Sequence, residues 1–496
     1  MTMLPGLRMC TTGALPGWWR LPAKRILPIA VIMLVAAANP AWASYCVYVG
    51  KNLTIDGSVF LGGYGDEPSS HWLEIVPSGT FPPGAMIWVG VTERANFPGV
   101  LKQIPQVART AKYITMNYSE YSGFPAPLTN GGLNEHGVAA RDVWSPSRRE
   151  LQGMTPNPQT GGPNYSDLAR IVMERAHTAR EAVEIIGALI AEHGFSTYGG
   201  NSHLFADADE GWVVIDFAGG QGLWAAERLG PDDVRVSRPG YIGDFPVDFE
   251  NDPDYMASPN FVSFAIEQGW YDPDSGEPFN VNKVYGDGQM RHPAVEMIEE
   301  RMKALAGKVG LTDMIAAVRT TEVTGDSAGY GQVAHLRKGV HQELGVLWVA
   351  ATTSVTAPFI PFHIGTTDVP TQLKRHRYLT GGEATQYMVD DEERGIESTR
   401  FALRTYKRLL YLTEEHQEKF LPEVTEALEA FEGRLIERQE SVEETALNLF
   451  EAGEPELARR YLTYYSSTEA LNGWRLGEAL ANSIEARTEA LYGIRQ

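Results

Sequence analysis

The residues with the clearest chemical potential follow an apolar N-terminal segment. Ser44 comes directly after Ala41-Trp42-Ala43, a small-x-small triplet typical of a signal-peptidase cleavage site. Cleavage after Ala43 leaves Ser44 with a free α-amine, and the ordinary pKa of such an amine, about 8, makes it a base at neutral pH. A hydroxyl beside its own amine combines nucleophile and base in one residue. Ser44 is therefore a candidate for acyl-transfer chemistry, although a small residue here also suits signal peptidase alone.

Cys46 is the second candidate nucleophile. The chain has two cysteines, and Cys10 leaves with the N-terminal segment, so no disulfide can form within the remaining chain. A lone thiol here is either a small buried hydrophobic residue in a first strand or a nucleophile. The second interpretation requires removal of Ser44 and Tyr45, because Cys46 otherwise has no amine of its own. We expect Ser44 to act.

The segment before Ser44 is predicted to be a signal peptide over residues 1–43. It carries four basic residues and no acidic one, followed by an apolar run over residues 26–38, in the order that secretory signals share. The run is too short to span a bilayer comfortably. We therefore expect no stable membrane anchor and a periplasmic or secreted location.

The net charge of the remaining chain limits the classes of partner that it is expected to bind. It has 63 acidic residues, against 38 basic ones once the leader's four are removed. This excess of negative charge argues against nucleic acid or anionic lipid as a partner. Whether the chain forms a homo-oligomer is left open.

The elements that must position Ser44 are short strands, which the sequence favours from Ser44 to about Gly240. Residues 45–49 and 58–62 are β-prone runs around a turn, a pattern typical of a hairpin. Residues 204–206 and 212–217 predict the clearest hairpin, because both arms alternate or run apolar as strands with a buried face do.

Helices interrupt and follow these strands. Ser166 can cap a helix over residues 167–176, and Thr178 with Glu181 forms a capping-box pattern that opens a second helix. Residues 241–290 have weak periodicity and predict an irregular segment. From about Asp390 the chain changes to long helices rich in Glu and Arg with regularly spaced apolar residues.

Short blocks of sequence between Ser44 and Pro370 form an ordered series. They lie at residues 44–52, 56–58, 66, 81–85, 132–139, 175–182, 206–207, 210–212, 361–363, 365 and 369–370. In this order they resemble the secreted dipeptidase family of N-terminal-nucleophile hydrolases, which are relatives of bile-salt hydrolase. That family usually begins with Cys, and its register places the opening position on Ser44. The resemblance therefore implies a Ser nucleophile where most relatives have Cys.

The resemblance also implies roles for Asp66 and Asn134. Relatives hold a carboxylate at the position of Asp66, where it can orient the terminal amine and balance its charge; the alternative is a turn aspartate. Relatives use the amide matching Asn134 as an oxyanion-hole donor; the alternative is an Asx-turn. An arginine that many relatives carry is replaced by Gly63, and a second asparagine expected near residues 236–240 is absent.

Two further residues are weaker candidates for substrate binding. Asn201 precedes a strand, and Arg238 can bind a substrate carboxylate; both are more often structural. No histidine or acidic cluster has metal-ligand spacing, and phosphate-loop and dinucleotide fingerprints are absent. We therefore expect neither metal nor cofactor.

These patterns lead to one expected architecture and three candidate functions. The fold is expected to be α+β, and the resemblance implies an αββα four-layer sandwich over residues 44–389 with a helical region over residues 390–496. The expected activity is hydrolysis of dipeptides or short peptides. The alternatives are an acylase for non-peptide amides, of bile-salt or acyl-lactone type, and a non-catalytic periplasmic peptide-binding protein.

Overall fold

The chain divides into two units, Met1–Ala41 and Trp42–Gln496, and all described residues lie in the second. The computed structural model describes residues 44–65, 71–118, 121–288, 291–325, 328–375 and 401–493. The predicted signal peptide and the predicted start of the C-terminal region at residue 390 both lie outside the described residues. Every element below belongs to the second unit.

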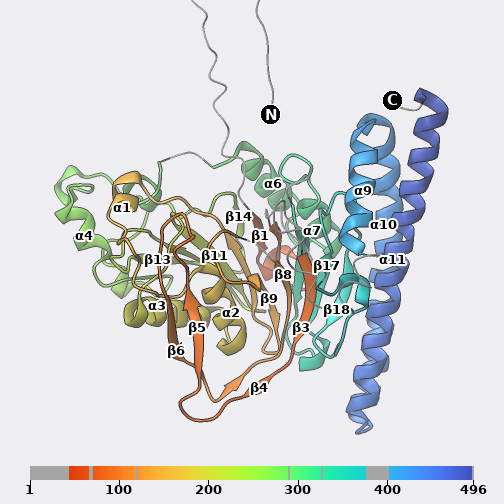
Figure 1. Cartoon of the computed structure of the whole chain (residues 1–496), viewed down its shortest axis with the longest axis horizontal. Coiled ribbons are helices and arrows are strands. Elements are labelled where there is room, and N and C mark those ends of the chain that lie inside the picture. The colour runs from red at the N-terminus through yellow and green to blue at the C-terminus, as the bar shows by residue number, and fades with distance from the viewer. Residues whose placement is uncertain are drawn as a thin grey trace, which may run out of the picture. The chain divides into compact units, whose positions relative to one another are not determined.

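Two antiparallel sheets form the body of this unit (Figure 1). The six-stranded sheet has the order β14 (Val234–Ser237), β1 (Tyr45–Val49), β2 (Val59–Gly65), β16 (Tyr330–Leu336), β17 (Val346–Ala350), β18 (Ile360–His363). The eight-stranded sheet has the order β15 (Tyr255–Ala257), β13 (Trp224–Leu229), β12 (Gly211–Asp216), β11 (Asn201–Ala206), β10 (Ala139–Val143), β9 (Leu128–Asn134), β8 (Tyr113–Tyr118), β3 (His71–Val76). Two separate ribbons pair β4 (Gly79–Thr80) with β7 (Arg109–Thr110), and β5 (Met86–Gly90) with β6 (Leu101–Pro105).

The helices are distributed along the whole described chain. They are α1 (Arg149–Gly153), α2 (Tyr165–Arg175), α3 (Ala179–His193), α4 (Phe261–Glu267), α5 (Val281–Val284), α6 (Pro293–Ala304), α7 (Leu311–Val318), α9 (Ala402–Glu414), α10 (Gln417–Glu451) and α11 (Pro455–Tyr492). Together with the sheets they confirm the predicted α+β class.

Local sequence explains where the two early helices begin. The Thr178 side chain accepts a hydrogen bond from the Glu181 amide at the start of α3, as predicted. The cap of α2 differs from the prediction, because Asn164 rather than Ser166 caps this helix and forms a capping box with Asp167. Asparagine is as effective an N-cap as serine, so the pattern located the helix two residues too late.

Alternation along β12 shows that the eight-stranded sheet is buried on both faces. Val213 and Ile215 pack in the main apolar cluster with β1 and β2. Trp212 and Val214 pack in a second cluster with α2 and α3. Successive strand residues point to opposite faces, so one face meets the six-stranded sheet and the other meets these helices. The predicted hairpins of β1 with β2 and of β11 with β12 are both confirmed.

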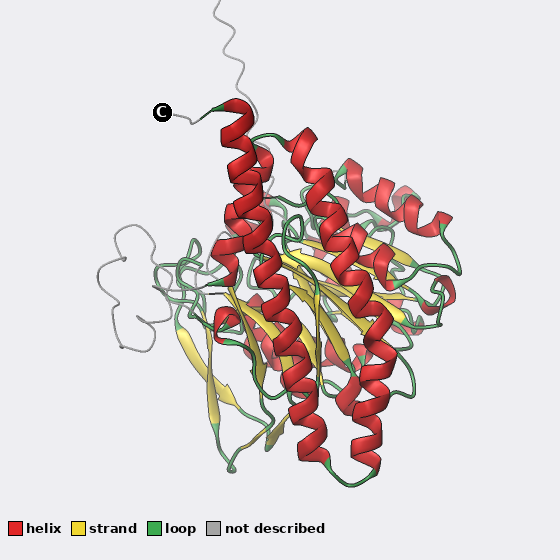
Figure 2. Ribbon diagram, turned by 90° about the vertical axis from the view of Figure 1, so that its right-hand side faces the viewer, coloured by secondary structure: helices red, strands yellow, loops and turns green. Residues whose placement is uncertain are grey.

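The C-terminal helices pack against the six-stranded sheet at β18. Figure 2 looks onto this helical layer, with the long helices α10 and α11 joined by a short loop in front of the strands. Phe431 of α10 and Trp474 of α11 belong to the same apolar cluster as β1. The helices are therefore part of the main core.

Candidate functional site

Ser44 directly precedes β1, which lies between β14 and β2 in the six-stranded sheet. The residue is 7% exposed, and all of β1 is buried. The side chain of Tyr48 points toward the eight-stranded sheet, because a Cβ on Gly211 of β12 would lie 2.5 Å from its ring. Side chains alternate along a strand, so Cys46 and Ser44 face the same way. Both therefore face the space between the sheets.

Strand register identifies the neighbours of Ser44 within its own sheet. Tyr45 pairs with Tyr64, and Gly65 pairs with Tyr330. Continuing the first pairing by one residue places Ser44 beside Gly65, in the same row as Tyr330. The Gly329 amide donates to the Gly65 carbonyl at 2.7 Å, which continues the pairing of β2 with β16 beyond Tyr330. On the β2 side, the residue directly beside Ser44 is thus a glycine.

The opposite sheet contributes a buried cation to this region. Arg141 of β10 is 0% exposed and donates from Nη1 to the Tyr330 hydroxyl. Its guanidinium carbon lies 5.0 Å from the centroid of the Tyr330 ring. Arg141 lies outside the sequence blocks from which the catalytic residues were predicted. The signal was present nonetheless, because Arg141 and Asp142 interrupt an otherwise apolar strand, and a charge inside a buried strand is a candidate for function.

A histidine from β3 also reaches this end of the sheet. A Cβ on Gly329 would lie 2.0 Å from Cε1 of His71, so the imidazole occupies the space that this glycine leaves. The ring of His71 lies 5.4 Å from that of Tyr330 and stacks on that of Tyr118. Neither His71 nor Tyr330 belongs to a recognisable motif.

Cys46 is enclosed rather than reactive. It is 0% exposed, and burial raises the pKa of its thiol to about 12, a shift that Arg141 partly opposes. The thiol is therefore protonated at neutral pH, and the thiolate is the nucleophilic form. This environment favours a packing role for Cys46 over the alternative of a second nucleophile.

Asn134 makes a complete set of local hydrogen bonds at another place. Its Nδ2 donates to the carbonyls of Met173 (3.3 Å) and Ala176 (2.8 Å), and its Oδ1 accepts from the amides of His136 and Val138, both at 3.0 Å. An amide side chain has two N–H donors, and both are used here. The side chain thus closes the β9–β10 turn and binds the C-terminal end of α2.

The position of Asn134 also separates it from Ser44. Asn134 and Leu336 line one cavity of about 470 Å³, and Leu336 pairs with Val59 at the start of β2. Ser44 lies beside the other end of this seven-residue strand, which spans roughly 20 Å. The structure therefore does not bring Asn134 to Ser44, and it supports the Asx-turn alternative rather than an oxyanion role.

Asn201 and Arg238 have different surroundings. Asn201 is 0% exposed, accepts from the Tyr198 hydroxyl at 2.8 Å, and shares a strand face with His203 and Phe205. Phe205 belongs to the cluster with α2 and α3, so the sheet separates Asn201 from Ser44. Arg238 follows β14 at the Ser44 end, donates to the Tyr64 hydroxyl and is partly exposed. The structure brings Arg238, but not Asn201, to this end of the sheet, on the face that carries Tyr45 and Tyr64 rather than the face of Ser44. Asp66 lies outside the described residues.

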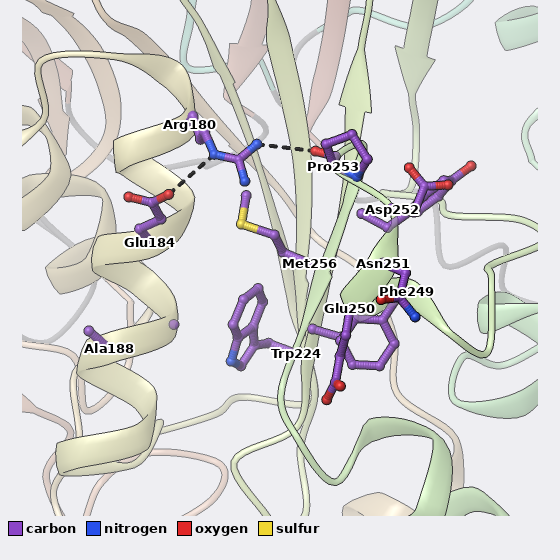
Figure 3. Close-up of a pocket in the computed structure, with 13 residues that line it drawn as sticks. Arg180, Glu184, Ala188, Trp224, Phe249, Glu250, Asn251, Asp252, Pro253 and Met256 are labelled. Carbon is purple, nitrogen blue, oxygen red and sulfur yellow. Dashed lines mark hydrogen bonds and ion pairs between the residues drawn. The ribbon is translucent and has the colours of Figure 1, made fainter.

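A separate cavity of about 570 Å³ lies between α3 and the edge strand β15 (Figure 3). Trp224 and Met256 form part of its wall. Arg180 is held by Glu184 at 3.2 Å and by the Pro253 carbonyl at 3.1 Å. Its lining contains no residue of β1, β2 or β10, so this cavity is distinct from the Ser44 region.

The described residues contain no group of three or more His, Cys, Asp or Glu side chains able to hold a metal ion. None of the helices in the described ranges is both long enough and apolar enough to cross a membrane.

Comparison with known proteins gives a consistent set of relatives. The sequence profile of peptidase family C69 matches residues 45–295. A probable dipeptidase of Salmonella dublin is 34% identical over 271 residues, which are 53% of this chain and 57% of that protein. Dipeptidase A of Lactobacillus helveticus is 27% identical over 164 residues, 32% of this chain and 33% of that protein. A dipeptidase of Bifidobacterium longum is 28% identical over 264 residues, 48% of this chain and 46% of that protein. The matches span about half, or less, of the length of these curated relatives.

Proposed function

The chain belongs to peptidase family C69, and we propose that it is an exported dipeptidase whose nucleophile is Ser44, freed by signal-peptide cleavage after Ala43. The observation that carries this proposal is a coincidence of two boundaries. The family match begins at Tyr45, one residue after the position at which the leader pattern predicts cleavage. The names of the relatives support dipeptides as the substrate class.

The proposed reaction uses two half-reactions at one residue. The Ser44 α-amine takes the hydroxyl proton while Oγ attacks the substrate carbonyl carbon and forms a tetrahedral oxyanion, which backbone N–H groups stabilise. The C–N bond breaks, the ammonium proton passes to the leaving amine, and an acyl ester remains on Oγ. Water then attacks the ester and gives a proton to the α-amine. When the C–O bond breaks, that proton returns to Oγ and the acid product leaves.

The arrangement of the elements supports an αββα four-layer N-terminal-nucleophile sandwich as the architecture. Helices α6 and α7 pack on the six-stranded sheet, and α2 and α3 pack on the eight-stranded sheet. Strand β10 contacts β1 and β2 between them. In this proposal Ser44 opens into the layer between the sheets.

The test is expression of the full chain with its leader, followed by mass spectrometry of the mature N-terminus and assay against a dipeptide panel. A mature chain that begins at Ser44 and hydrolyses dipeptides is expected, and Ser44→Ala is expected to abolish hydrolysis. The matched control is Cys46→Ser, which changes a neighbouring side chain of the same strand and should retain activity. A mature chain that begins before Ser44, or an active Ser44→Ala variant, would overturn the proposal.

The same assay separates the two alternatives. Cleavage of non-peptide amides without cleavage of dipeptides would indicate an acylase. Dipeptide binding that is equal in the wild-type protein and in Ser44→Ala, with no hydrolysis by either, would indicate a peptide-binding protein.

A further inference from the structure

Arg141 is a fully buried cation in the layer between the two sheets. Its strand neighbours of the same parity, Ala139 and Val143, belong to the main apolar cluster with β1, so Arg141 points toward the six-stranded sheet. A buried charge is costly unless other groups compensate for it. The position of this charge therefore needs a physical explanation.

The facing surface of the six-stranded sheet leaves room for the guanidinium. Cys46 pairs with Ser237 on one side and with Gly63 on the other, and Gly63 pairs with Gln332. These side chains are small except for Gln332, whose Nε2 donates across the layer to the Ala140 carbonyl at 3.1 Å. This hydrogen bond joins the two sheets beside Arg141. In the same row, Cys46 and Gly63 have small side chains and leave space in the layer.

One contact and one electrostatic effect place the guanidinium near the Ser44 row. Its hydrogen bond reaches Tyr330, which shares a row with Ser44, and its charge acts on the thiol of Cys46, which lies in the next row of inward-facing residues. Such rows are separated by two residues, or roughly 7 Å. The guanidinium therefore lies on the inner face of the six-stranded sheet, near the rows of Ser44 and Cys46.

We propose that Arg141 is a positioning residue for the reaction of Ser44: its fixed positive charge opposes protonation of the Ser44 α-amine and so keeps that amine available as the base at neutral pH. This inference rests on the proposed function. Arginine stays charged at every pH at which the protein is folded, so its effect on the amine is constant. A nearby like charge disfavours a second cation.

Other titratable and charged groups surround this place and contribute to the field at the amine. His71 and Tyr330 border the Gly329 end, Asp142 lies on the opposite face of β10, and Arg238 contacts Tyr64 on the opposite face of the six-stranded sheet. Asp66 belongs to the segment outside the described residues. At the Cys46 thiol, the pKa-lowering effect of Arg141 is larger than the opposing effect of Asp142, so the net field of this pair is that of a cation.

The experiment compares Arg141→Gln, which removes the charge, with Arg141→Lys, which retains it. The matched control is Arg235→Gln. Arg235 lies in β14, pairs with Tyr48 four residues from Ser44, and binds Glu227 at 2.7 Å. Two quantities are measured in each mature, folded variant. They are the pH dependence of kcat/KM for a dipeptide, and the pH dependence of acylation of the N-terminal amine, followed by peptide mass spectrometry.

The expected result is a shift in both profiles. In Arg141→Gln the acid limb of kcat/KM and the midpoint of amine acylation should move to higher pH by about one unit. In Arg141→Lys and Arg235→Gln they should stay at the wild-type position. Unshifted profiles in a folded Arg141→Gln variant would overturn the inference, since loss of a purely structural contact lowers activity without moving the acid limb. Acylation reads the amine directly, so it tests Arg141 even if the wild-type protein hydrolyses no dipeptide.

Discussion

Arg319 at the end of α7 and Glu432 in α10 form a buried, two-pronged ion pair. Their Nη1–Oε2 and Nη2–Oε1 distances are 3.0 and 2.5 Å, and their side chains are 8% and 3% exposed. Glu432 also accepts from the Phe359 amide at 2.8 Å. This pair joins the long C-terminal helix to the element that packs on β1, β2 and β16.

Breaking one half of this pair should destabilise the protein strongly. Arg319→Leu leaves the Glu432 carboxylate buried without its cation, and we expect a loss of about 3–5 kcal/mol in the free energy of unfolding. The double variant Arg319→Leu/Glu432→Leu should lose much less than the sum of the two single variants. Urea unfolding measures all four proteins. Additive losses would show that the two side chains are not energetically coupled.

Cys46 should resist alkylation in the folded protein. Because burial raises the pKa of its thiol to about 12, almost no thiolate exists at neutral pH, and the side chain is enclosed. Iodoacetamide should leave the native wild-type protein unmodified and should label it in urea. The comparison is Ser44→Cys, whose terminal thiol should be labelled in the native state with loss of activity. Rapid labelling of native wild-type protein would contradict this expectation.

Asn134 should matter for stability more than for turnover. Asn134→Ala removes hydrogen bonds to four backbone groups, and we expect a loss of about 2–3 kcal/mol. Below the new unfolding transition, kcat should remain within a few-fold of wild type. Thermal unfolding and steady-state kinetics measure the two effects. A stable variant with kcat reduced by about a hundredfold would instead restore the oxyanion role.

His203 should make stability depend on pH. Burial lowers the pKa of His203, but the hydrogen bond and charge of Asp216, 3.2 Å away, outweigh burial, and the pKa is raised overall. The stabilisation from this pair is therefore present below the unfolded pKa of about 6.5 and is lost as pH rises through the raised folded pKa.

The matched comparison for that effect is His203→Gln against His177→Gln. The destabilisation caused by His203→Gln should be larger at about pH 6 than at about pH 9, as measured by urea unfolding. His177 lies 3.1 Å from Glu181 and its side chain is 62% exposed, so its replacement should have a small effect at both pH values. A His203→Gln effect that is independent of pH would argue that the pair is neutral.

Local sequence patterns predicted much of the secondary structure, because helix caps and strand alternation depend on residues that are close together in the chain. The alternation of residues 212–217 and the cap of α3 at Thr178 each follow from neighbours within a few positions. The same reasoning placed the cap of α2 two residues late, since Asn164 and Ser166 are both good caps. Residues 241–290 were predicted to be irregular, and the short helices α4 and α5 within them are too brief to produce a clear period.

By itself the sequence determined the candidate nucleophile at Ser44, because a cleavage pattern and a strand start are both written in consecutive residues. Only the tertiary structure decided the surroundings of that residue. Arg141 reaches the Ser44 row from the other sheet, about a hundred residues along the chain from β1, and Asn134 turns toward the end of α2. Sequence spacing carries no information on which strand faces which, since contacts between layers are made by residues far apart in the chain.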